Sequence, residues 1–172
     1  MTDSPSFSPE NGPSPENGIP PETAALVARA RAARGHAHAP YSRFAVGAAV
    51  RLTDGSIVTG SNFENASYGL SLCAETVALA SVNAAGRLAD VAAIAVVGAP
   101  MDGSGDDVVV SPCGRCRQVM NEAEQMAGRT LAIHCAAVRG DAVVEHRLAQ
   151  LLPHAFGPAN LGIGPNKKNQ GN

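Results

Sequence analysis

Cys113 and Cys116 offer the clearest chemistry in the sequence, because only two residues separate their thiols. Pro112 precedes them, and proline stops an upstream helix from continuing, so this spacing predicts a loop that turns directly into a helix. Unpaired N–H groups and the positive dipole end of a first helical turn lower the pKa of a thiol. The resulting thiolates could bind zinc or perform redox chemistry, and the pair alone does not distinguish the two.

A third cysteine upstream favours a metal site. Cys73 stands at the predicted start of another helix, two residues before Glu75. If both helix starts lie at the carboxyl ends of their strands, where α/β proteins bind ligands, Cys73, Cys113 and Cys116 converge. Three protein ligands and one open tetrahedral position are typical of a catalytic zinc ion. A water in that position has its pKa lowered from about 15.7 to about 7.

Glu75 is not needed as a ligand in this arrangement. Its carboxylate could move a proton to and from the metal-bound water, or it could only complement the positive end of its helix. The pairing of Cys-x-Glu with Pro-Cys-x-x-Cys favours the catalytic role, because zinc deaminases use this kind of ligand set and glutamate. The remaining cysteine, Cys135, lies in an apolar run and is expected in the core rather than at the metal.

The hydrophobic pattern predicts an α/β domain with helices packed on a mixed sheet. Asp54-Gly55 indicates a two-residue hairpin turn, and the continuous apolar run at 91–99 indicates a central strand. Helices are expected at 21–35, 73–86, 114–127 and 146–152, with strands at 44–53, 56–61, 91–99, 130–138 and 142–145.

The chain has 172 residues, enough for one domain, which we expect at 21–161. Residues 1–20 and 162–172 have the composition of disordered tails, with a docking peptide as the alternative for the first. The formal net charge of −2 and the lack of a basic stripe argue against a nucleic-acid partner. With no apolar run long enough for a bilayer and no secretory signal, we expect no membrane partner and a reducing, cytoplasmic location.

Two loops contain polar residues that could bind ligands. The loop at 62–72 contains two asparagines, a glutamate and a tyrosine, and it could contact a ligand or only connect a strand to a helix. His36 and His38 lie in another predicted loop. They could be metal ligands, but the absence of a nearby acid or cysteine in the sequence favours ordinary surface residues.

Five blocks of the sequence, spread between residues 40 and 161, resemble the small homotetrameric cytidine deaminases. They are 40–49 (PYSRFAVGAA), 62–68 (NFENASY), 73–75 (CAE), 111–118 (SPCGRCRQ) and 151–157 (LLPHAFG). The resemblance implies hydrolytic deamination of cytidine and 2′-deoxycytidine in pyrimidine salvage, with one zinc ion per subunit. It also implies a three-layer α/β/α fold with a five-stranded mixed sheet. Glu75 would take the proton from the zinc-bound water, protonate N3 of the base and help ammonia leave.

The same resemblance implies contacts to a nucleoside substrate. Asn62 and Glu64 match contacts to the ribose hydroxyls. Phe44 matches an aromatic ring against the pyrimidine, and the Ala74 backbone matches a contact to the base edge.

Two more aromatic residues concern the assembly of the protein. In the family that this sequence resembles, Tyr68 and Phe156 lie at a site completed by neighbouring subunits. The resemblance therefore implies a homotetramer.

The sequence departs from the commonest family pattern at Thr76. Many relatives have an arginine there that hydrogen-bonds the zinc thiolates. Because three thiolates on one zinc ion leave a net charge of −1, a positive partner is expected. Arg115 or Arg117, together with the helix N-termini, could supply it; alternatively, both could face solvent or a subunit interface.

Other functions remain open at this point. Residues 73–79 (CAETVAL) also resemble the site helix of blasticidin S deaminases, although Asn62 and Glu64 favour a nucleoside. A structural zinc module would need a fourth protein ligand. A thiol–disulfide protein would use only Cys113 and Cys116 and would bind no metal.

Overall fold

The computed structural model describes residues 18–165, so most of both predicted tails lies outside the described residues. The helices and strands are α1 (Pro21–Arg34), β1 (Phe44–Leu52), β2 (Ile57–Ser61), α2 (Ala74–Ala84), β3 (Val91–Pro100), α3 (Gly114–Ala127), β4 (Ala132–Ala136), β5 (Val143–Arg147) and α4 (Leu148–Leu151). Three short 3-10 helices, η1 (Tyr68–Leu70), η2 (Leu88–Asp90) and η3 (Pro158–Leu161), lie in the connections.

The five strands form one mixed sheet in the order β2-β1-β3-β4-β5. β3 and β4 are parallel, and the other neighbours are antiparallel. The hairpin between β1 and β2 turns at Gly55, whose φ of 85° is the left-handed conformation that the Asp-Gly pair predicts. The last helix is shorter than predicted, because His146 and Arg147 pair with β4 and extend β5 instead.

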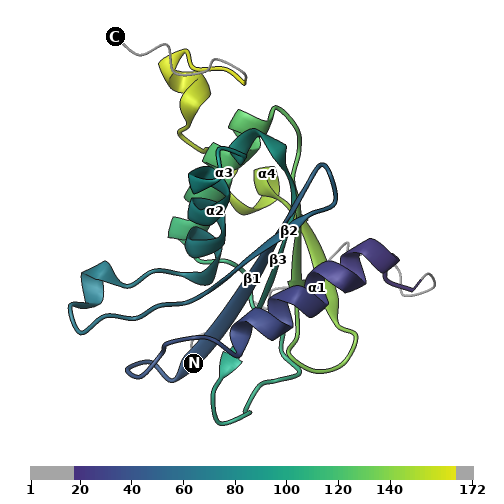
Figure 1. The fold of residues 1–172 in the computed structure, drawn as a ribbon, viewed down its shortest axis with the longest axis vertical. Coiled ribbons are helices and arrows are strands. Elements are labelled where there is room, and N and C mark those ends of the chain that lie inside the picture. The colour runs from purple at the N-terminus through teal and green to yellow at the C-terminus, as the bar shows by residue number, and fades with distance from the viewer. Residues whose placement is uncertain (1–17, 166–172) are drawn as a thin grey trace, which may run out of the picture.

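Helices cover both faces of the sheet (Figure 1). Leu26, Val27 and Ala30 of α1 pack on one face. The other face packs against α2 and α3, with Leu79 and Met120 among the buried side chains. The predicted three-layer α/β/α fold is therefore confirmed. Within residues 18–165, no helix is both long and apolar enough to cross a membrane.

Candidate active site

The starts of α2 and α3 lie at the same edge of the sheet. β2 and β3 both run antiparallel to β1, so they point the same way, and the helix that follows each strand begins at the same end. Cys73 and Cys113 are the residues immediately before α2 and α3, and both have extended backbones with ψ of 152° and 165°. Cys116 lies in the first turn of α3. The predicted placement of all three thiols is confirmed.

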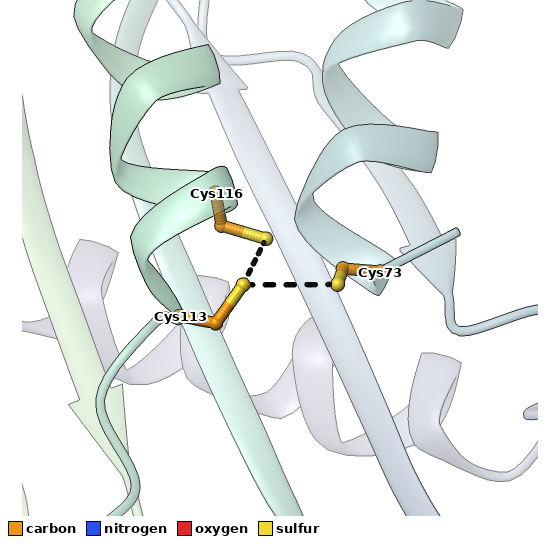
Figure 2. A group of neighbouring side chains, drawn as sticks. All are labelled: Cys73, Cys113 and Cys116. Carbon is orange, nitrogen blue, oxygen red and sulfur yellow. Dashed lines mark hydrogen bonds between the residues drawn. The ribbon is translucent and has the colours of Figure 1, made fainter. Parts of the chain in front are cut away.

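The three sulfurs form one compact cluster (Figure 2). Sγ of Cys113 lies 3.9 Å from Sγ of Cys73 and 3.5 Å from Sγ of Cys116, and all three atoms lie within 4.8 Å of one another. A zinc–sulfur bond of about 2.3 Å in tetrahedral geometry requires sulfurs about 3.8 Å apart, so the cluster fits one zinc ion. Among the described residues, no fourth His, Cys, Asp or Glu joins it.

The thiols of Cys73 and Cys116 differ in pKa in the metal-free protein. Hydrogen bonding to Cys116 lowers the pKa of Cys73 to about 6, and the positive charge of Arg115 contributes in the same direction. Hydrogen bonding to Cys73 and burial raise the pKa of Cys116, so in the metal-free protein this thiol keeps its proton. Zinc needs thiolates as ligands, and its binding therefore releases a proton from Cys116.

Glu75 is the buried acid beside this cluster. It is only 4% exposed, although glutamate is seldom buried. Burial raises its pKa, because the charged carboxylate loses its hydration. A carboxyl in this environment accepts a proton more readily than an exposed glutamate does, and it can pass that proton to a neighbouring group.

A cavity of about 320 Å³ opens beside Glu75 and the cluster, a size that accommodates a small ligand. Of the predicted site residues, its wall includes Phe44, Asn62, Glu64, Cys73, Glu75 and Cys113. The structure therefore brings together a metal site, a buried acid, an aromatic ring and two polar side chains.

Asn62 and Glu64 are fixed in the wall by backbone hydrogen bonds. Asn62 accepts from the N–H of Val46 at 2.8 Å and donates to the carbonyl of Phe44 at 2.9 Å. One Glu64 oxygen accepts from the N–H groups of Tyr41 and Ser42, at 2.9 and 3.2 Å. The Ser42 side chain and these N–H groups lower the pKa of Glu64 by stabilising its charged form.

The family is established by comparison with known proteins. The family model for the cytidine and deoxycytidylate deaminase zinc-binding region matches residues 21–131. The chain belongs to this deaminase family. It is 44% identical over 131 residues to the cytidine deaminase of Halalkalibacterium halodurans. The matched stretch covers 76% of this chain and 91% of that protein.

Two solved deaminase structures are similar to this one. The cytidine deaminase of Burkholderia pseudomallei has 48% identity and a TM-score of 0.67, over 77% of this chain and 98% of that chain. The cytidine deaminase of Mycobacterium tuberculosis has 41% identity and a TM-score of 0.62, and the match covers 78% of this chain and 97% of that chain. Together with the family model's zinc-binding region, the sulfur cluster identifies one zinc site per deaminase chain.

Three predicted contact residues of this deaminase lie outside the cavity wall. Ala74 is fully buried in the first turn of α2. Tyr68 and Phe156 are 72% and 61% exposed. Within one chain, neither aromatic side chain is part of the wall.

The residues predicted to offset the thiolate charge occupy different environments. Oγ1 of Thr76 lies 4.0 Å from Sγ of Cys116. Arg115 donates to the carbonyl of Ser71 at 3.2 Å, and thus spans the gap between the two helix starts. Arg117 donates to the carbonyls of Pro112 and Leu151, at 2.8 and 3.0 Å.

Sequence reasoning missed half of the cavity wall. The missed residues are Val46, Ser71, Leu72, Val96, Val110 and Ser111. Closeness to Cys73 and to Cys113 along the chain was an available signal for Ser71 and Leu72 and for Val110 and Ser111. Val46 and Val96 lie on adjacent strands, and no local pattern in the sequence marks them.

His36, His38 and Cys135 are not part of the sulfur cluster. His38 pairs with the loop at Asn62, whose carbonyl accepts from the His38 N–H at 2.9 Å. Cys135 is fully buried in β4, and burial raises its pKa to about 12. These positions agree with surface-loop residues and a core thiol.

Proposed function

We propose that this protein catalyses the hydrolytic deamination of cytidine and 2′-deoxycytidine to uridine and 2′-deoxyuridine, with release of ammonia. The observation that carries the proposal is the buried acid Glu75 in one cavity wall with Cys73 and Cys113, two of the three clustered thiols. Cytidine deaminases 44% identical to the chain support this choice of substrate. Residues 21–161 would form the catalytic domain.

Glu75 performs the proton transfers in this proposal. Bound zinc supplies the hydrolytic chemistry by lowering the pKa of a coordinated water. Glu75 would take one proton from the attacking water and pass it to ring nitrogen N3. It would then take the second proton from the new C4 hydroxyl and pass it to the amino group, which leaves as ammonia. Its buried position suits this role, because burial raises the pKa of Glu75 and so makes the carboxylate a better proton acceptor.

Three residues of the cavity wall and the backbone of Ala74 bind and orient the nucleoside. The Phe44 ring packs against the pyrimidine, and the backbone of Ala74 bonds the base edge. Asn62 and Glu64 bond the ribose hydroxyls. Since each is held by backbone hydrogen bonds before substrate arrives, little ordering entropy is lost on binding.

The charge of the cavity favours nucleosides over nucleotides. Its wall includes the carboxyl groups of Glu64 and Glu75, while none of the residues that line it is Lys or Arg. A 5′-phosphate would bring negative charge toward these groups without a positive partner. We therefore propose neutral nucleosides as the substrates.

Other functions receive less support. Blasticidin S, which also contains a cytosine ring, has no ribose hydroxyls for Asn62 and Glu64 to bond. A structural zinc module has no use for a buried glutamate beside its metal. A thiol–disulfide pair leaves Cys73 without a role, although its sulfur lies 3.9 Å from that of Cys113.

The proposed biological setting is pyrimidine salvage in the cytoplasm by a homotetramer, with neither nucleic acid nor membrane as a partner. Exposed aromatic side chains support the assembly. Tyr41 and Tyr68 pack edge to face with ring centroids 5.4 Å apart, and the two residues are 48% and 72% exposed. Such rings would gain free energy from burial against a second copy.

The test combines metal analysis of the purified protein with the ultraviolet change from cytidine to uridine. We expect one zinc ion per chain and turnover of cytidine and 2′-deoxycytidine, with little turnover of cytidine 5′-phosphate, cytosine or blasticidin S. Glu75→Gln keeps the shape of the side chain and should lower kcat by about 10²–10⁴-fold at unchanged zinc content. Turnover that survives this change would contradict the proposed mechanism.

A further inference from the structure

The C-terminal stretch at 153–161 lies against α3 with few apolar anchors. The side chains of Phe156 and Leu161 are 61% and 65% exposed, and only Gly157 and Pro158 of this stretch are buried. A segment stays ordered only if its contacts outweigh the conformational entropy that it loses. Polar contacts must therefore hold this stretch in place.

Three side-chain amides of α3 make those contacts, and we call Gln118, Asn121 and Gln125 the amide clamp. Their spacing of three and four residues places them on one face of the helix. Nε2 of Gln118 and Nδ2 of Asn121 both donate to the carbonyl of Phe156, at 2.6 and 3.1 Å. Gln125 accepts from the N–H of Ala159 at 2.9 Å and donates to Asn121 at 3.3 Å.

Gly157 lets the segment lie directly on the amide clamp. A Cβ at this position would stand 2.6 Å from an amide nitrogen of Asn121 and 2.6 Å from one of Gln125. Both nitrogens are engaged in hydrogen bonds, so they cannot move aside without losing them. Position 157 therefore requires glycine for steric reasons, since its φ of −161° is open to any residue.

We infer that the amide clamp and Gly157 form a positioning device for Phe156. Two amides fix the main-chain carbonyl of this residue, while its ring points out of the chain that holds it and remains exposed. The ring is thus presented in one place to a neighbouring molecule. This inference rests on the function and homotetramer proposed above, and on the expectation from the family resemblance that Phe156 lies at a site completed by neighbouring subunits.

The test compares Gly157→Ala with Gly164→Ala in the full-length, zinc-loaded protein. Gly164 is a matched control, because a Cβ there meets no atom within 4 Å and its φ is not left-handed. We expect Gly157→Ala to raise KM for cytidine about fivefold, with kcat within about twofold of wild type and unchanged zinc content. Gly164→Ala should match wild type. A lower Tm with an unchanged KM would overturn the inference.

Gln125→Ala provides a second variant in case Gly157→Ala does not fold. It removes the acceptor for Ala159 without adding atoms, so it should raise KM in the same direction by a smaller factor. Normal wild-type turnover with an unchanged KM in the variants would overturn this inference alone. Absence of cytidine turnover in the wild type would overturn the proposed function, and this inference with it.

Discussion

Arg115 and Arg117 are only two residues apart, yet their guanidinium groups have different surroundings. Arg115 donates to Ser71, one residue from Leu72 and two from the ligand Cys73, and its charge favours the thiolate there. Arg117 donates to the carbonyls of Pro112 and Leu151, and it thereby links the loop before α3 to α4. Arg115 is therefore the better candidate for the positive partner that Thr76 does not provide.

This difference predicts that replacing Arg115 and replacing Arg117 will affect different properties of the protein. Arg115→Gln should shift the acidic limb of the pH–rate profile upward by about 0.5 unit, because an uncompensated negative charge disfavours deprotonation nearby. Arg117→Gln should leave the profile unchanged and lower Tm, since it removes two hydrogen bonds. The measurements are kcat/KM against pH and thermal unfolding. Identical profiles for Arg115→Gln and wild type would rule out this role.

At the scale of elements, the site depends on how closely α2 approaches β2. A Cβ at Gly60 would stand 2.5 Å from the carbonyl oxygen of Ala74 and 2.6 Å from the amide nitrogen of Ala78. Both are backbone atoms of α2, so they cannot yield by rotating a side chain. Glycine at this position therefore sets the height of the first turn of α2, which contains Glu75, above the sheet.

Gly60→Ala should push that turn away from the sheet. We expect a loss of about 1–3 kcal/mol in the free energy of unfolding, together with weaker zinc retention during dialysis against a chelator. Thr59→Ala is a suitable control, because neighbouring residues of a strand point to opposite faces. Chemical denaturation and metal analysis measure both effects. Wild-type zinc retention in Gly60→Ala would show that the close approach does not position the site.

At the scale of the whole molecule, His134 is a buried titratable group remote in sequence from the sulfur cluster. It is 5% exposed in β4, and its Nδ1 lies 3.7 Å from a carboxylate oxygen of Glu145 in β5. Burial lowers the pKa of His134, although the Glu145 charge opposes this shift. The folded protein therefore favours the neutral ring, and the unfolded chain binds the proton more readily.

The stability of the protein should consequently fall as the pH drops below the ordinary histidine pKa of about 6.5. Above that pH the ring is neutral in both the folded and the unfolded state, so its burial does not make the free energy of unfolding depend on pH. Between the ordinary and the lowered pKa, proton uptake favours unfolding. His134→Gln should flatten this part of the stability profile measured by urea unfolding, while His36→Gln, at an exposed position, should leave it intact. Equal slopes in all three proteins would contradict the prediction.

Assembly is the second property of the whole molecule. The exposed apolar side chains include Tyr41, Phe63, Tyr68, Leu70, Phe156 and Leu161. We expect sedimentation analysis to give a mass of four chains. Tyr68→Ser should weaken the assembly and raise KM by about fivefold, whereas Tyr68→Phe keeps the ring and should behave as wild type. A monomer with full activity would contradict the proposed shared site.

The sequence by itself determined the local features of this protein. Turn chemistry located the hairpin at Asp54-Gly55, and hydrophobic runs located the strands. Pro112 and the Cys-x-x-Cys spacing located the start of α3, and hydrophobic periodicity located α2. The five sequence blocks indicated the family. These signals are local because periodicity, capping and turn preferences act over only a few neighbouring residues.

Only the tertiary structure decided which distant residues meet. It brought the sulfurs of Cys73 and Cys113 to 3.9 Å and added Val46 and Val96 to the cavity wall. It also placed Arg43 in a left-handed conformation, with φ of 58°, where its carbonyl accepts from the N–H of Met101 at 2.7 Å. Such contacts depend on how the strands are ordered and how closely helices approach them, and short stretches of sequence do not encode these distances.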